Sequence, residues 1–219
     1  MVRILKDIYS EISISPILGF KGGSACYLFY DLPRFSVDLD FDLLDTNKEE
    51  IVFKEVKSIL EEYGEVKESF NKRSTLFFLI SYQNGASNIK VEISKRNFGS
   101  EYEIKNYLGI PVLVMKKEDI FAHKLVTLSE RKNTANRDLF DIHFFLKENW
   151  KINKEIVKER TGRSLGNYLK QCIEIIEAVN QKRILAGMGE LLDEKTKNWV
   201  KQNLKEDLLF LLKLKLENL

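Results

Sequence analysis

The sequence has few of the residues that build disulfides, zinc sites or membrane spans. Its only two cysteines, Cys26 and Cys172, lie far apart and have no CxxC partner, so we expect both to be small buried apolar residues. No apolar run approaches the roughly 20 residues that a membrane helix needs. Residues 1–13 lack the apolar centre and cleavage site of a signal peptide. We therefore expect a cytoplasmic globular protein that does not bind membranes.

The small net charge of +2 hides a difference between the two halves of the chain. Residues 1–115 hold 14 Lys and Arg against 17 Asp and Glu, a net charge of −3, whereas residues 116–219 hold 21 against 16, a net charge of +5. An acidic first half and a basic second half suit an enzyme that binds metal in one lobe and phosphates in the other.

Hydrophobic periodicity divides the chain near Met115. It predicts an α/β (α+β) core with a mixed sheet in residues 1–115, followed by an all-helical half in residues 116–219 that completes an active-site cleft. A turn is expected at Asn84-Gly85. The predicted strands are 17–21, 36–44, 74–82, 88–94, 102–107 and 111–115, and the predicted helices are 1–13, 24–30, 48–63, 117–131, 136–149, 164–180 and 195–216.

Two carboxylates, Asp38 and Asp40, lie on the polar face of the predicted strand 36–44. Because they are two residues apart on a strand, they point the same way and repel each other, an arrangement that a bound divalent cation stabilises. Magnesium prefers such oxygen ligands, and two ions about 3.5–4 Å apart would assist phosphoryl transfer, with manganese as a substitute. Glu92, on the polar face of a neighbouring strand, is predicted to be the third metal ligand.

The acidic run also suits two other kinds of site. Asp38, Asp40, Asp42 and Glu49 match positions 1, 3, 5 and 12 of a calcium-binding loop, but Leu43 stands where that loop needs glycine. A phosphatase with an aspartyl nucleophile also uses an Asp-x-Asp pair, but that class has a continuous apolar strand before the first aspartate. Residues 33–36 do not form one, so we prefer the metal-binding strand.

The turn Gly22-Gly23-Ser24 precedes the acidic strand. Glycines let backbone N–H groups approach a phosphate closely, and the start of a helix favours anions. Ser24 is expected to cap the helix 24–30. A plain tight turn would have the same sequence, so the proposed role in binding a nucleotide depends on the acidic strand that follows.

A second polar group is expected on two helices of the second half. Lys124 and Arg131 are seven residues apart and share a helix face, where they could hold a triphosphate. Asp138 and Asp141 share a face of the next helix. The alternative is a structural network in which arginine and aspartate side chains hold the two helices together.

These motifs, taken in order from Phe20 to Leu146, are similar to a known family. The order G-G-S, R-F-S-x-D-L-D-F, K-V-E-I, H-K-L and R-K-x(4)-R-D-L-F-D-I resembles the AbiEii/AbiGii-type nucleotidyltransferase toxins of the DNA polymerase β-like superfamily. The resemblance implies a nucleotidyltransferase core with these functional residues: Asp38 and Asp40 for the metals, Glu92 as the third acidic position, Gly23 and Ser24 for the triphosphate, Arg34 and Ser36 for the active-site loop, Lys124 for the nucleotide phosphates, and Asp138 and Asp141 as the last acidic motif.

The resemblance also implies an activity and partners. Such a toxin would transfer a nucleoside monophosphate from a triphosphate to RNA, with the 3′ end of tRNA as the expected acceptor, and release pyrophosphate. It would act in a toxin–antitoxin or phage-defence system and bind a cognate antitoxin protein. Two alternatives stay open, namely transfer to a protein hydroxyl and a non-catalytic interaction module that keeps the fold.

Overall fold

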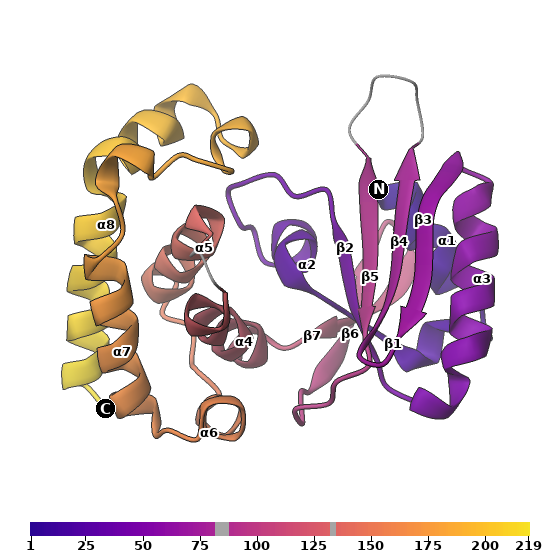
Figure 1. The fold of residues 1–219 in the computed structure, drawn as a ribbon, viewed down its shortest axis with the longest axis horizontal. Coiled ribbons are helices and arrows are strands. Elements are labelled where there is room, and N and C mark those ends of the chain that lie inside the picture. The colour runs from indigo at the N-terminus through magenta and orange to yellow at the C-terminus, as the bar shows by residue number, and fades with distance from the viewer. Residues whose placement is uncertain (82–87, 132–134) are drawn as a thin grey trace. The chain divides into compact units, whose positions relative to one another are not determined.

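The computed structural model describes residues 1–81, 88–131 and 135–219, and their contacts divide the chain into two units (Figure 1). Unit 1 comprises Met1–Asp31 and Phe35–Lys116, and unit 2 comprises Leu32–Arg34 and Lys117–Leu219. Among the described residues, no helix combines the length and the apolar content that crossing a membrane requires.

Unit 1 is built on a seven-stranded sheet with the order β3-β4-β5-β2-β1-β7-β6. The pairs β2–β5 and β1–β7 are parallel and the other neighbouring pairs are antiparallel, so the prediction of a mixed sheet is confirmed. Its elements are α1 (Val2–Ser10), β1 (Leu18–Lys21), α2 (Gly22–Phe29), β2 (Leu39–Leu43), α3 (Glu49–Glu61), β3 (Glu65–Lys72), β4 (Thr75–Ser81), β5 (Ile89–Ser94), β6 (Tyr102–Tyr107) and β7 (Ile110–Met115).

Alternation along the strands separates an apolar face of this sheet from a polar one. On the apolar face the Phe20 ring contacts Phe29 of α2, the Phe41 ring contacts Tyr9 of α1, and the Phe78 ring contacts Phe53 of α3. Phe20, Phe41 and Phe78 are fully buried. The helices therefore cover the apolar face, and the residues of opposite parity on β1, β2 and β5 form the polar face.

The structure differs from the sequence prediction in two strands of unit 1. Strand β3 was not predicted, because polar side chains occupy both of its faces and its residues are half-buried or exposed. Strand β2 begins at Leu39 rather than at residue 36, so Asp38 lies immediately before the strand. The predicted turn at Asn84-Gly85 lies outside the described residues.

Unit 2 is helical, as the sequence predicted for the second half. Along α8 the residues Val200, Leu204, Leu208 and Leu212 recur every fourth position and are fully buried, and α8 packs against α5 and α7. Helix α6 was missed because only two adjacent residues of it are buried. The helices of unit 2 are α4 (Lys117–Glu130), α5 (Asn136–Lys147), α6 (Lys154–Thr161), α7 (Leu165–Glu177) and α8 (Glu194–Glu217).

The contacts divide the chain differently from the predicted domains 1–115 and 116–219. The short segment Leu32–Arg34, which lies between α2 and β2 in the sequence, belongs to the helical unit. The segment belongs to this unit because Arg34 forms a buried ion pair with Asp141 of α5. Hydrophobic periodicity cannot reveal such a segment, because three residues are too few to show a period.

Candidate active site

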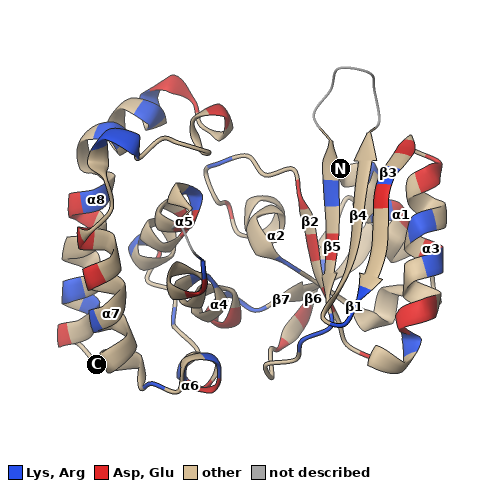
Figure 2. Cartoon of the chain, in the orientation of Figure 1, with Lys and Arg blue, Asp and Glu red and all other residues tan. Residues whose placement is uncertain are grey.

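The polar face of unit 1 gathers acidic side chains through the register of three strands. In β2, Asp40 is opposite Lys21 of β1 and opposite Glu92 of β5. Register partners point to the same face of a sheet, so Glu92 lies beside Asp40 as the sequence predicted. Figure 2 shows the acidic residues along β2 and the residues of both signs along β5. Their roles in catalysis stay predictions.

A lysine that the sequence analysis did not single out, Lys90, lies within this acidic group. Its Nζ is 3.6 Å from Oδ2 of Asp38 and 3.6 Å from Oε2 of Glu92. In the described parts of the chain, no three His, Cys, Asp or Glu side chains come together as a metal-binding group. The oxygen donors of Asp38, Asp40 and Glu92 are of the kind that Mg²⁺ prefers, but an ammonium group lies between two of them. Lys90 was detectable in principle, because it precedes Glu92 by two residues on a strand.

Burial raises the pKa of Asp40 above its ordinary value, and this is the main effect on this carboxyl. The positive charge of Lys90 acts against that rise, the negative charge of Asp38 adds to it, and Lys21 and Glu92 have smaller effects of opposite sign. A carboxylate that is buried next to like charges favours a nearby cation. The electrostatics of Asp40 therefore suit a cation-binding role.

The turn before α2 is adjacent to Asp40. Gly22 has a φ of +77°, and a Cβ built at this position would lie 2.5 Å from Oδ2 of Asp40. A side chain at position 22 would thus be strained and would also collide with the carboxylate. Gly23 is buried in the first turn of α2.

Ser24 does not cap the helix as predicted. Helix α2 already begins at Gly22, and the hydroxyl of Ser24 donates a hydrogen bond to the backbone carbonyl of Asp38. The reason for the error is that Gly22 adopts the left-handed conformation and lets the helix follow β1 directly. Ser24 therefore positions the segment that carries Asp38.

Asp42, the third aspartate of β2, has a different environment. It accepts a hydrogen bond from Lys21 Nζ at 2.6 Å and another from the hydroxyl of Tyr102 at 2.6 Å. The residue is buried. These contacts make Asp42 a structural member of the polar face.

A second polar group lies within unit 2 and joins α4, α5 and the segment Leu32–Arg34. Arg34 donates to Asp141 through Nε at 2.5 Å and Nη2 at 2.7 Å. Lys124 Nζ lies 3.0 Å from Asp138 and 3.0 Å from Asp141. Arg131 Nη1 lies 3.1 Å from Asp138. The structural network that the sequence analysis kept as an alternative is therefore present, and the predicted nucleotide contacts of Lys124 and Arg131 stay predictions.

Burial and pairing act in opposite directions on this network. Burial works to lower the pKa of Lys124, but Asp141 and Asp138 outweigh it and the net shift is upward. Burial works to raise the pKa of Asp141, but Lys124 and Arg34 outweigh it and the net shift is downward. Both groups are therefore charged near neutral pH.

Ser36, predicted to shape the active-site loop, is half-buried in the segment before β2.

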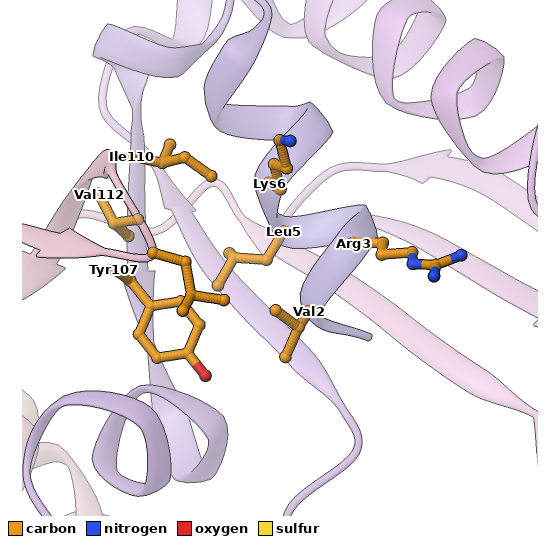
Figure 3. A pocket seen from close by; sticks show the side chains of 8 residues that line it. Val2, Arg3, Leu5, Lys6, Tyr107, Ile110 and Val112 are labelled. Carbon is orange, nitrogen blue, oxygen red and sulfur yellow. The ribbon is translucent and has the colours of Figure 1, made fainter.

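Other hollows of the described residues include one in each unit. In unit 1, a cavity of about 170 Å³ between α1 and the β6–β7 hairpin is lined mainly by apolar residues such as Leu5 and Val112 (Figure 3). No carboxylate is among its lining residues, so it lacks the carboxylate ligands that a magnesium site uses. In unit 2, a hollow of about 530 Å³ is lined by Trp199, Phe140 and Phe144, together with two lysines and two carboxylates.

Comparisons with known proteins agree with these observations. A family model described as "Nucleotidyl transferase AbiEii toxin, Type IV TA system", where TA denotes toxin–antitoxin, matches residues 3–210. The fold is similar to that of a Helicobacter pylori protein assigned as a nucleotidyltransferase (TM-score 0.65, 23% identity, covering 99% of this chain and 95% of that chain). It is also similar to JHP933 from Helicobacter pylori (TM-score 0.62, 24% identity, 99% and 92%). None of the curated proteins matches the chain.

The close approach of Gly22 to Asp40 leads to a first prediction. Gly22→Ala should destabilise the protein by more than backbone strain alone, which costs about 1–3 kcal/mol, because the added methyl group also displaces the carboxylate of Asp40. The measurement is the free energy of unfolding from urea denaturation.

Gly109→Ala is a matched control for this prediction. Gly109 has a φ of +83° but nothing within 4 Å of a Cβ built there, so this variant carries the strain without the collision. Equal losses of stability in the two variants would contradict the proposed collision with Asp40.

The buried network leads to a second prediction, for Asp141→Asn. Removing this charge leaves Arg34 and Lys124 incompletely compensated, and breaking a buried pair typically costs about 3–5 kcal/mol. Because the folded-state pKa of Asp141 is lowered, its contribution is complete above the ordinary value of 3.8 and is lost as the pH falls through the lower folded value.

Asp141→Asn should therefore have a lower free energy of unfolding than the natural protein near neutral pH. That free energy should also fall less as the pH is lowered, as measured by denaturation at several pH values. Glu177→Gln is the control, because Glu177 pairs with Lys213 at 3.2 Å with both side chains at least half exposed. Such surface pairs contribute about 0–1 kcal/mol. The role of Asp141 would be refuted by an effect as small as that of the control.

Proposed function

The chain belongs to the AbiEii family of nucleotidyl transferase toxins, and we propose that it transfers a nucleoside monophosphate from a nucleoside triphosphate to a hydroxyl of RNA, with the 3′ end of tRNA as the acceptor. The observation that carries this proposal is the acidic face of unit 1, where Asp40 is the register partner of Glu92 and lies beside the glycine turn of α2, with Asp38 two residues before it in the chain. The family also implies a cognate antitoxin as protein partner.

In the proposed reaction, an oxygen of the acceptor hydroxyl attacks the α-phosphorus of the triphosphate. The bond from the α-phosphorus to the bridging oxygen breaks, pyrophosphate leaves, and the hydroxyl proton passes to solvent. Asp38, Asp40 and Glu92 would hold magnesium, as two ions or with manganese as a substitute, which supplies positive charge for the phosphates and activates the hydroxyl. The backbone at Gly22 and Gly23 would approach the triphosphate at the start of α2.

The network of unit 2 supports a contact with phosphates. Arg34, Lys124 and Arg131 carry three positive charges against the two negative charges of Asp138 and Asp141, which leaves the group with one excess positive charge. The Arg131 side chain is 39% exposed. We propose that Arg131 presents this excess charge to a phosphate group, while Lys124 and Arg34 hold the two aspartates in place.

The helical unit also has features that suit an RNA acceptor. Residues 116–219 carry a net charge of +5, which favours a polyanion. In the hollow of unit 2, the ring centroids of Trp199 and His143 are 4.9 Å apart. Burial lowers the pKa of His143, although its hydrogen bond with Asp207 acts in the opposite direction. Aromatic rings of this kind stack on unpaired bases of RNA.

The proposed chemistry predicts different effects for two aspartates of β2. Asp40→Asn should lower the rate of transfer by about a thousandfold or more, because a metal ligand contributes several kcal/mol to the transition state. Asp42→Asn should mainly destabilise the protein, because Asp42 is held by Lys21 and Tyr102. The assay uses magnesium, each labelled triphosphate in turn, total RNA and cell extract.

The position of the label decides between the two possible acceptors. Label on RNA supports the proposal, whereas label on a protein would indicate transfer to a protein hydroxyl instead. Full activity of Asp40→Asn would refute the assignment of Asp40 as a metal ligand.

The hollow in unit 2 leads to a prediction about RNA binding. Trp199→Leu should weaken the binding of labelled tRNA about tenfold, since stacking of one base on an aromatic ring contributes about 1–3 kcal/mol. Phe210→Leu is the control, because Phe210 also lies on α8 and is 63% exposed but does not line the hollow. Fluorescence anisotropy measures both affinities, and equal values would argue against this hollow as the RNA contact.

A further inference from the structure

Lys90 is a basic residue within the acidic face, and the proposed reaction gives it no role. It lies on β5, two residues before Glu92 and on the same face of the sheet. Its ammonium group is equidistant, at 3.6 Å, from carboxylate oxygens of Asp38 and Glu92. A third carboxylate, that of Asp40, is the register partner of Glu92. Lys90 thus lies where three negative charges approach one another.

The contacts of Lys90 are loose in comparison with those of the nearby Lys21. The Nζ of Lys21 lies 2.6 Å from Oδ1 of Asp42, a close hydrogen-bonded ion pair. The two distances of Lys90 are 1.0 Å longer and its side chain is 29% exposed. The positive charge of Lys90 therefore neutralises the acidic face without the short hydrogen bonds that would hold the ammonium group permanently in place.

The chemistry of the same oxygens suits a divalent cation better than an ammonium group. A carboxylate cluster binds a compact divalent cation through several oxygens at about 2.0–2.1 Å for magnesium. A cation so placed would repel the ammonium group of Lys90. The long, flexible side chain of lysine can withdraw into solvent without any change in the backbone.

We propose that Lys90 is an exchangeable counter-ion of the active site: it neutralises Asp38 and Glu92 while no metal is bound, and a divalent cation displaces it. This inference rests on the proposed function in so far as the acidic face binds the metal. It implies that Lys90 weakens the binding of free metal. The metal then binds most favourably together with the triphosphate, whose oxygens add ligands and whose negative charge can receive the displaced ammonium group.

The test is the affinity of the full-length protein for Mn²⁺ alone, measured by calorimetry at constant ionic strength. Lys90→Met keeps the length of the side chain and removes its charge, so it should bind Mn²⁺ about tenfold more tightly or better. Lys90→Gln is a second neutral variant in case the first folds poorly. Lys90→Arg keeps the charge and should bind Mn²⁺ about as weakly as the natural protein.

Lys95→Met is the matched control. Lys95 follows the end of β5 and forms an ion pair with Glu49 at 2.7 Å and a hydrogen bond with Asn71 at 2.9 Å, away from the acidic face. Its loss should leave the affinity for Mn²⁺ unchanged. Without metal, Lys90→Met should also have a lower melting temperature than the natural protein, and Mn²⁺ should raise that temperature more in the variant.

The outcomes separate this inference from the proposed function. Unchanged or weaker Mn²⁺ binding in both neutral variants would overturn the role of Lys90. If no variant binds Mn²⁺ although all are folded, both the proposed role of Lys90 as a counter-ion and the proposed metal site are refuted. Tighter Mn²⁺ binding by the neutral variants, combined with no transfer to RNA or protein by the natural enzyme, would support the counter-ion and refute the proposed function.

Discussion

The register of β2 between β1 and β5 is the constraint on which the candidate active site depends. It brings Asp40 between Lys21 and Glu92, and Asp38 lies immediately before the strand. Because side chains alternate across a strand, the same register that buries Phe41 in the apolar core places the carboxylates on the opposite face. A shift by one residue would exchange the two faces, so the stability of the core and the geometry of the acidic group are coupled.

This gathering of like charges would destabilise the fold if it were not balanced, and unit 1 balances it in two ways. Asp42 is held by a lysine and a tyrosine at short distances and belongs to the permanent structure. Asp38 and Glu92 share the more distant ammonium group of Lys90. Short contacts therefore hold Asp42, whereas the ion pairs of Asp38 and Glu92 with Lys90 are longer.

In unit 2, negative charges are also compensated by nearby positive charges, and there the carboxylates are more buried. Its two aspartates, Asp138 and Asp141, are almost completely buried, and burying an unpaired charge is expensive. Cations from α4, from the residue that follows it and from the segment Leu32–Arg34 surround them. The network therefore ties a segment that interrupts unit 1 in the sequence to the helical unit. The motif R-D-L-F-D-I, identified in the sequence as an acidic motif, is thus also a packing motif.

The sequence by itself determined the features that depend on local periodicity. The alternation of residues 37–43 was sufficient to predict a strand with one acidic and one apolar face, and the repeats along residues 117–216 were sufficient to predict most helices of unit 2. Only the tertiary structure decided that Lys90 lies between Asp38 and Glu92, that Ser24 binds the carbonyl of Asp38 and that Arg34 pairs with Asp141. Each of these contacts joins residues 14 to 107 positions apart or depends on the parallel pairing of two strands. Periodicity records which face of an element is buried, but it carries no information about which distant charge that face will meet.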